Sequence, residues 1–395
     1  MKFPERYQPE NNHSFSSYWK PTSDNLLPKL LPNVSLEESE QLIPLYFQVD
    51  ELGDAVAKEY FSNKRFSEAI GTLHRDFSMY PSNKEKLSEA TQELFKQLTD
   101  IPAWVNFDLI NLAATYCNRC GTSALSVLRN YCLMGGYESS AINKPLIFTQ
   151  ALHKGAVKRL ADTVDFWMNV TTVNGLKSQQ KGIYSILTTR LIHSYSRLQI
   201  EKSTDWKPEL WGRPINLWDM LATNLGFSIA FMDGLSKLKL PPTKEELNAV
   251  LHLWKYVGYL LGIPLELLPD SGEEATKQLY LWSKTQKGID QDSKDLAWAL
   301  YEEPKLVTFT NNSFMKWFVQ KTNVGYNEVL LGAESRSALG LPYSKGKYWI
   351  LLLNNINQYF DKKAKSNPKS YIKVALRGRK QQEDVWDLYR KEKKQ

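Results

Sequence analysis

The chain has 395 residues, of which 42% are hydrophobic and 24% charged, so it can bury a sizeable core and is not of the disordered or fibrous class. Its three cysteines are too few for a disulfide framework and favour a reducing compartment. The net charge of +7 lies at one end, because residues 361–395 carry 12 Lys and Arg against 5 Asp and Glu while the first 360 residues balance. We therefore expect no nucleic-acid partner for the body, and we interpret residues 361–395 as a basic surface tail that could weakly contact an anionic membrane or RNA.

The first residues are polar and lack the apolar core of a secretory signal. The longest apolar stretch, Val257 to Leu268, is interrupted by glycine, proline and glutamate and falls short of the roughly 20 residues that span a bilayer. These two observations predict a cytoplasmic protein without a transmembrane segment.

Residues 1–34 are rich in proline and asparagine and predict an extended arm that is wrapped on the surface or partly disordered. Residues 35–360 predict one helical domain. Its helix starts are marked by capping boxes, in which a Ser or Thr and a Glu three residues later satisfy the first free amides of a helix. Four such pairs precede periodic apolar runs: Ser35/Glu38, Ser82/Glu85, Thr243/Glu246 and Ser271/Glu274.

Helix stops are predicted at Pro102, at Gly135-Gly136 and at Gly262-Ile263-Pro264. Two short runs, Lys305 to Thr310 and Tyr348 to Leu353, are typical of either a strand or a buried helix. With no stronger strand signal and no repeat, the sequence predicts an all-α fold.

Cys117 and Cys120 form a C-x-x-C pair, but zinc would need a second pair and covalent haem attachment would need a histidine where Gly121 stands. Two cysteines one helical turn apart in an apolar stretch are most often core residues, and we predict that role here. Phosphate-binding glycine loops, zinc-protease motifs and the hydrolase nucleophile elbow do not occur in the sequence.

His193 lies in an apolar-periodic helix, in the segment RLIHSYSR, with Arg190 three residues before it and Arg197 four residues after it. All three share one helix face. A histidine between two arginines suits an anionic cofactor, with the imidazole on a metal and the arginines on carboxylates. The same pattern also describes a hydrogen-bonded core histidine beside surface arginines, which this helix alone favours.

The preceding predicted helix contains RLADT, which places Arg159 and Thr163 on one face with Asp162 beside them. Arg and Asp at this spacing are more often a surface ion pair. If the face lined a pocket, the same three residues could bind and protonate dioxygen species.

Taken together, R-L-x-x-T and R-L-x-H-x-x-x-R, separated by roughly 30 residues, resemble the core signature of the rubber oxygenase (latex clearing protein) family, which also includes the ER-bound oxygenase of mycophenolic acid biosynthesis. Two further blocks resemble this family, PINLWDMLATNLGFS from Pro214 and HLWKYVGYLLGIPLELLP from His252. The resemblance covers about residues 100–270.

This resemblance implies a helical fold with a globin-like core and a non-covalently bound haem b. It implies that His193 is the proximal iron ligand, that Arg159 and Thr163 lie at the haem pocket, and that Arg190 and Arg197 support the site at a propionate or through the helix bearing His193. Latex-cleaving members carry a lysine where this chain has Asp162, so we expect an open sixth iron position. The family's catalytic glutamate has no clear counterpart, which leaves Glu138 and Asp162 as candidate bases.

The implied reaction is cleavage of a C=C bond by dioxygen in an apolar, polyprenyl-like substrate. Because the sequence lacks the export signal of the latex enzymes, we expect a small molecule and not polymeric rubber. Two alternatives stay open from the sequence: a haem-binding sensor or carrier without turnover, and a haem-free helical interaction protein.

Overall fold

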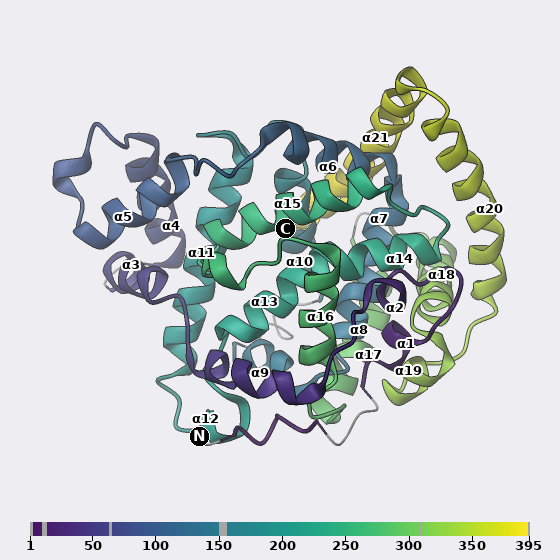
Figure 1. Cartoon of the computed structure of the whole chain (residues 1–395), viewed down its shortest axis with the longest axis horizontal. Helices are drawn as coiled ribbons and strands as arrows, with labels where there is room; N and C mark the ends of the chain where they lie inside the picture. Colours follow the sequence, from purple (N-terminus) through teal and green to yellow (C-terminus); the bar gives the residue numbers. More distant parts are fainter. Residues whose placement is uncertain (1–2, 10–13, 63–64, 150–155, 309, 394–395) are drawn as a thin grey trace.

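The structure is a computed structural model that describes residues 3–9, 14–62, 65–149, 156–308 and 310–393. In these ranges the chain forms helices and no β-strand, with one isolated bridge between Tyr7 and Gln286. The all-α prediction is confirmed (Figure 1).

The elements follow one another along the chain as α1 (Ser16–Trp19), α2 (Leu27–Leu30), η1 (Leu36–Phe47), α3 (Glu51–Phe61), α4 (Phe66–Ser78), η2 (Lys84–Lys86), α5 (Glu89–Thr99), α6 (Phe107–Arg119), α7 (Gly121–Val127), η3 (Leu128–Leu133), α8 (Met134–Gly136), α9 (Ser140–Phe148), α10 (Ala156–Val170), α11 (Lys181–Ile200), α12 (Pro208–Trp211), α13 (Leu217–Leu225), η4 (Gly226–Ala230), α14 (Phe231–Lys237), α15 (Lys244–Leu260), η5 (Leu265–Leu267), α16 (Gly272–Ser283), α17 (Gln291–Leu306), α18 (Ser313–Leu330), α19 (Gly332–Ala338), α20 (Gly346–Lys365) and α21 (Pro368–Lys393).

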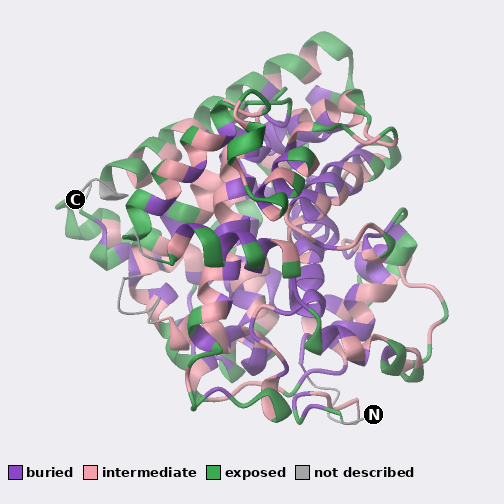
Figure 2. Cartoon of the chain, turned by 90° about the vertical axis from the view of Figure 1, so that its left-hand side faces the viewer, coloured by how far each residue is buried: buried purple, intermediate pink, exposed green. Residues whose placement is uncertain are grey.

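The middle of the molecule is a bundle in which α6 packs against α15 and α21, and α10 packs against α11 and α21. The helices α3, α4 and α5 lie at one end of the long axis, and α18 and α20 lie at the other end (Figure 1). Seen along the long axis, buried residues gather in the interior and exposed residues lie on the outward sides of the helices (Figure 2). Among the described residues, none of the helices has both the length and the apolar character required to cross a bilayer.

Two of the four predicted capping boxes form with both hydrogen bonds, at Ser35/Glu38 and Thr243/Glu246. At Ser271 the hydroxyl accepts from the backbone of Glu274, whereas the Glu274 carboxylate accepts from Asp270. The prediction at Ser82/Glu85 is wrong, because α5 starts at Glu89 and Ser88 caps it by accepting from the Thr91 amide.

The two runs that were ambiguous between strand and helix are both free of strand in their described residues. Lys305 and Leu306 end α17, and Tyr348 to Leu353 lie inside α20. Most of the second run is exposed, so the alternative of a buried helix is also wrong there.

The N-terminal arm contains α1 and α2 and is anchored in the core. Phe15, Tyr18 and Leu27 are all buried. The Tyr18 ring stacks on Tyr131 with 4.4 Å between ring centroids, and Phe15 meets Trp282 edge to face at 5.5 Å. The arm therefore belongs to the folded body and is more than a surface wrapping.

The basic C-terminal segment is not the separate surface tail that its charge suggested. It begins inside α20 and continues as α21, which packs against α6, α7 and α10. Gln382 is fully buried and donates to the carbonyl oxygens of Cys117 at 2.8 Å and Gly121 at 2.9 Å. Arg379 also points inward, since its guanidinium donates to the Met168 oxygen at 3.3 Å and to the Thr172 hydroxyl at 2.9 Å.

Candidate functional site

The helices α10 and α11 form an antiparallel pair that carries most of the predicted site residues. Near the connecting loop, Asn169 of α10 donates to the Ser185 hydroxyl of α11 at 2.9 Å. Gly182 lets the connecting loop pack closely on the start of α11, because a Cβ there would lie 2.5 Å from the Gly175 oxygen. Both helices rise about 1.5 Å per residue, so this register places His193, eight residues beyond Ser185, at the height of the RLADT segment.

His193 has the properties of a neutral imidazole available to a ligand. Its Nδ1 is buried and has no hydrogen-bond partner in the described part of the chain. Burial lowers the pKa of His193 to about 4, helped by the positive charge of Arg197 and opposed by Asp50. A neutral ring nitrogen is the form that binds a metal, so this residue fits the role of an iron ligand.

Arg190 is held by acidic and polar groups of other helices. Its guanidinium donates to both carboxylate oxygens of Asp50, from Nε at 2.7 Å and from Nη2 at 2.8 Å. Nη1 donates to Gln97 Oε1 and to the Leu260 oxygen, each at 3.1 Å.

Arg197 is held in the same manner one turn further along α3. It donates to the Asp54 carboxylate from Nε and Nη2, and to the backbone oxygen of Ile215 at 2.7 Å. With these partners both arginines fasten α11 to α3. The contacts of neither guanidinium leave it directed at an anionic cofactor.

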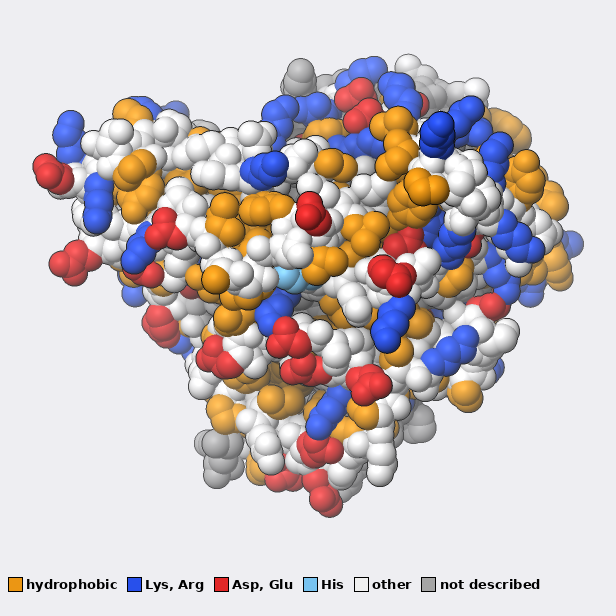
Figure 3. Space-filling model, turned by 45° about the horizontal axis from the view of Figure 1, so that its top comes forward, with side chains coloured by type: hydrophobic (Ala, Val, Ile, Leu, Met, Phe, Trp, Pro, Cys, Tyr) orange, Lys and Arg blue, Asp and Glu red, His pale blue; other side chains and the backbone are white. Residues whose placement is uncertain are grey.

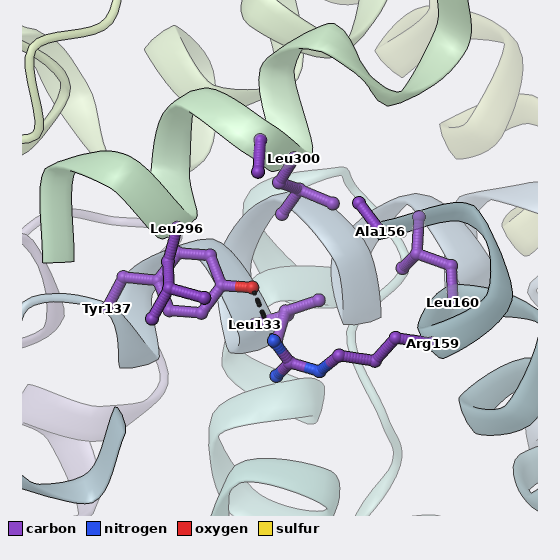
Figure 4. A pocket seen from close by; sticks show the side chains of 8 residues that line it. Leu133, Tyr137, Ala156, Arg159, Leu160, Leu296 and Leu300 are labelled. Atoms are coloured by element: carbon purple, nitrogen blue, oxygen red, sulfur yellow. Dashed lines mark hydrogen bonds between the residues drawn. The ribbon is translucent and has the colours of Figure 1, made fainter. Parts of the chain in front are cut away.

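Arg159 lies at the polar end of a small apolar pocket (Figure 4). Its Nη1 donates to the Tyr137 hydroxyl at 3.0 Å, and the structure gives it no carboxylate partner among the described residues. The pocket has a cavity volume of about 10 Å³, the space of one water molecule. Its apolar walls come from η3, α10 and α17: Leu133, Ala156, Leu160, Leu296, Ala299 and Leu300.

The other two RLADT candidates occupy different surroundings. Thr163 is half-buried, and its hydroxyl donates to the Arg159 backbone oxygen at 3.0 Å. Asp162 is an exposed residue of α10, so the structure does not enclose it in an apolar pocket.

Glu138 is a buried carboxyl group that faces the N-terminal arm. Its Oε2 accepts a hydrogen bond from the Phe15 amide at 2.8 Å. Burial raises the pKa of Glu138 to about 7, and the bond from Phe15 partly offsets this rise. Its neighbour Tyr137 lines the pocket of Arg159, whereas Glu138 does not.

The structure therefore brings some predicted residues together and separates others. His193, Arg190 and Arg197 share α11. Along the helix pair, His193 is level with Arg159 and Thr163 of α10. Asp50 and Asp54 were not among the predicted site residues, although their i, i+4 spacing at a helix start is a signal of paired carboxylates. Tyr137 was not predicted either, and no sequence signal distinguishes it.

Cys117 and Cys120 are buried in the core at the end of α6, as predicted. Burial raises the pKa of the Cys120 thiol to about 12, and it raises the pKa of Cys117 as well. Neither thiol is activated at neutral pH. In the described residues, no group of three or more His, Cys, Asp and Glu side chains could hold a metal ion.

Comparisons with known proteins agree with this architecture. Residues 119–353 match the family described as ER-bound oxygenase mpaB/B'/Rubber oxygenase, catalytic domain. This match covers more than half of the chain, and the protein belongs to that family. The structure is similar to "Structure of Latex Clearing Protein LCP in the closed state", with a TM-score of 0.63 and 14% sequence identity over 84% of this chain and 91% of that chain. No curated protein sequence shows significant similarity.

Proposed function

We propose that this protein is a haem b-dependent oxygenase that cleaves a C=C bond of an apolar, polyprenyl-like small molecule. Membership of the rubber oxygenase family supports the oxygenase class. The observation that supports the cofactor is the neutral imidazole of His193, whose buried Nδ1 has no hydrogen-bond partner among the described residues. Haem bound there would supply the binding and activation of dioxygen.

The residues of this chain would divide the remaining work. His193 would hold the iron from α11, and the ion pairs of Arg190 and Arg197 with α3 would fix that helix in position. Arg159 would present its guanidinium from α10 beside the Tyr137 hydroxyl. The apolar walls next to Arg159 would exclude water from that end of the site.

Two carboxylates, those of Glu138 and Asp162, are candidates for the base that accepts the substrate proton. A base for an allylic proton works best with a pKa near the working pH, and the pKa of Glu138, raised to about 7, meets that requirement. Asp162 lies on α10 next to Thr163 but is exposed. We favour Glu138, which would need to turn from Phe15 toward the pocket lined by Tyr137.

The test combines three measurements on the full chain. The purified protein is loaded with haem, its visible spectrum is recorded, and dioxygen consumption is followed with a short polyprenyl substrate. We expect a Soret band, and carbonyl products in a fixed ratio to the dioxygen consumed. A protein that stays colourless after haem loading would refute the cofactor assignment and support a haem-free interaction protein.

A haem-binding sensor or carrier without turnover is the second candidate. It is favoured by the positions of the two carboxylates, one exposed and one facing the arm. Stable haem binding without dioxygen consumption would support this candidate. Glu138→Gln and Asp162→Asn, compared at equal haem content, would identify the base if turnover is observed.

A further inference from the structure

The helix α20 differs from an ordinary surface helix, because its inner face buries polar side chains beside the apolar Ile350 and Ala364. Its inner face carries Asn354, Asn357 and Asp361, whose side chains bind the body of the protein. Asn354 donates to the Lys237 oxygen at 3.3 Å and Asn357 to the Leu238 oxygen at 3.0 Å.

The outer face of α20 consists largely of exposed apolar and aromatic side chains. Tyr348 and Tyr359 are 61% and 62% exposed, and the leucines and tryptophan between them are about half exposed. We call this group the α20 face: Tyr348, Trp349, Leu351, Leu352, Ile356 and Tyr359. A monomeric soluble protein rarely exposes so many large apolar side chains in one place, so the face calls for an occupant.

The neighbouring helix α18, against which α20 packs, has further exposed apolar residues in its first two turns. They are Phe314, Met315, Trp317, Phe318 and Val319, each at least 40% exposed. Hydrophobic side chains and lysines or arginines are mixed along the edge of the molecule where α20 lies (Figure 3).

The charge around the α20 face is strongly positive. Between Tyr343 and Arg377 the sequence has eight Lys and Arg and one acidic residue, Asp361. Asp361 is buried and is paired with Arg119 and Lys365, so it offsets the charge of Lys365. The positive charge of this stretch therefore comes from the other seven Lys and Arg.

Two of these cations lie within cation–π distance of the exposed rings. The Lys347 ammonium lies 5.3 Å from the ring centroids of both Tyr343 and Tyr348, and the Lys363 ammonium lies 6.0 Å from that of Tyr359. Lysine side chains have an apolar stem and a charged end, which suits a boundary between hydrocarbon and water.

We propose that the α20 face docks on an anionic lipid bilayer, with its rings and aliphatic side chains among the acyl chains and its lysines at the headgroups. Tyrosine and tryptophan favour the interface between hydrocarbon and headgroups, and a helix with a cationic rim and an apolar face lies in that plane. A second copy of this chain is a poorer occupant, because two such faces would bring like charges together. The docking rests on the surface alone and does not depend on the proposed reaction.

The test uses the full chain with vesicles of phosphatidylcholine alone or with phosphatidylserine added. We expect binding by flotation to the anionic vesicles, weakening as salt is raised. K362Q/K363Q should lower partitioning roughly 30-fold, given about 1 kcal/mol for each lysine near the surface. Separately, W349S/L352S should lower it at least as much, because a buried apolar side chain contributes more than a lysine at the surface.

Matched controls carry the same kinds of change at other places. I101S replaces an apolar residue that is 50% exposed in the segment after α5, and K84Q/K86Q removes two exposed lysines from η2, at the opposite end of the molecule. Both should bind like the unaltered chain. In the unaltered chain, brominated lipids should quench tryptophan fluorescence, and W349F should weaken that quenching.

Three results would overturn the proposal. One is an equal loss of vesicle binding in the control variants. Another is absence of binding to anionic vesicles by the unaltered chain, whatever its haem content or activity. The third is a dimer in solution that W349S/L352S converts to monomer, since that would make the α20 face a contact between copies.

Discussion

Asp50 joins three parts of the molecule through its contact with Arg190. The carboxylate accepts hydrogen bonds from both Nε and Nη2 of Arg190. It also caps α3 by accepting a hydrogen bond from the Gly53 amide at 3.0 Å. The turn after α15 packs on the same group, since a Cβ on Gly262 would lie 2.5 Å from the Asp50 carboxyl carbon. One buried carboxylate thus links α3, α11 and α15. Its contact on α11, Arg190, stands three residues before His193.

Asp50→Asn is expected to lower the free energy of unfolding by about 3 kcal/mol, because it leaves the Arg190 charge buried without its counter-ion. Urea unfolding followed by circular dichroism measures the change. Glu5→Gln is the matched control, since it removes a carboxylate from the exposed pair with Lys287 and should change stability by less than about 1 kcal/mol. Equal losses in the two variants would contradict the role of Asp50.

Gly378→Ala should separate α21 from α6. A Cβ at Gly378 would lie 2.1 Å from the backbone oxygen of Asn118, which cannot move without bending α6. Overpacking of this kind costs about 1–3 kcal/mol. The control is Gly71→Ala in α4, where a Cβ would meet no described residue within 4 Å. The better helix propensity of alanine should stabilise the protein there by up to about 1 kcal/mol. Thermal unfolding that moves in the same direction for both variants would refute the close packing of α21.

Much of the fold could be predicted because helix starts are local. Ser35 and Thr243 accept hydrogen bonds from backbone amides within three residues of themselves. A short segment of sequence is therefore enough to predict the helix start at each. The position of α21 could not be predicted in this manner. Its charge is conspicuous in the sequence, whereas the residues that fasten it, Gly378 and Gln382, act through contacts with α6 and α7 that are more than 250 positions away.

The candidate site shows the same division. The spacing of Arg190, His193 and Arg197 on one face follows from helix geometry. The ion pairs of these arginines with Asp50 and Asp54 could not be predicted in this way. They depend on the packing of α11 against α3, which is distant in sequence. The exposure of Asp162 likewise depends on which side of α10 faces its neighbours, which a single helix sequence does not fix.

His193→Ala is expected to abolish haem retention if His193 is the iron ligand. The protein is loaded with haem, passed through a desalting column and assayed for the cofactor by its reduced pyridine complex. His74→Ala is the control, because His74 lies on α4 with Nε2 2.7 Å from the Thr188 hydroxyl of α11, and its loss should leave haem content unchanged. Full haem content and an unaltered spectrum in His193→Ala would exclude the assignment.

Glu138→Gln should change how stability depends on pH. The pKa of Glu138 is raised to about 7 in the folded protein from an ordinary value of 4.5, mainly by burial. Between these two values the folded state binds more protons at this group than the unfolded state, so this group's contribution to stability falls as the pH rises. The penalty is absent below about pH 4.5 and complete above about pH 7, where it amounts to roughly 3 kcal/mol.

Glutamine keeps the shape of the protonated acid and does not titrate, so Glu138→Gln should gain stability over the unaltered chain as the pH rises from 5 to 8. Urea unfolding at several pH values gives this difference directly. His193 does not imitate the effect: its pKa is lowered to about 4, so its contribution falls as the pH drops from about 6.5 and is common to both proteins. A difference that stays constant from pH 5 to 8 would show that Glu138 is already ionised when folded. In that case the hydrogen bonds of Glu138 would outweigh the effect of burial on its pKa. Glu138 would then lack the near-neutral pKa that makes it the favoured base.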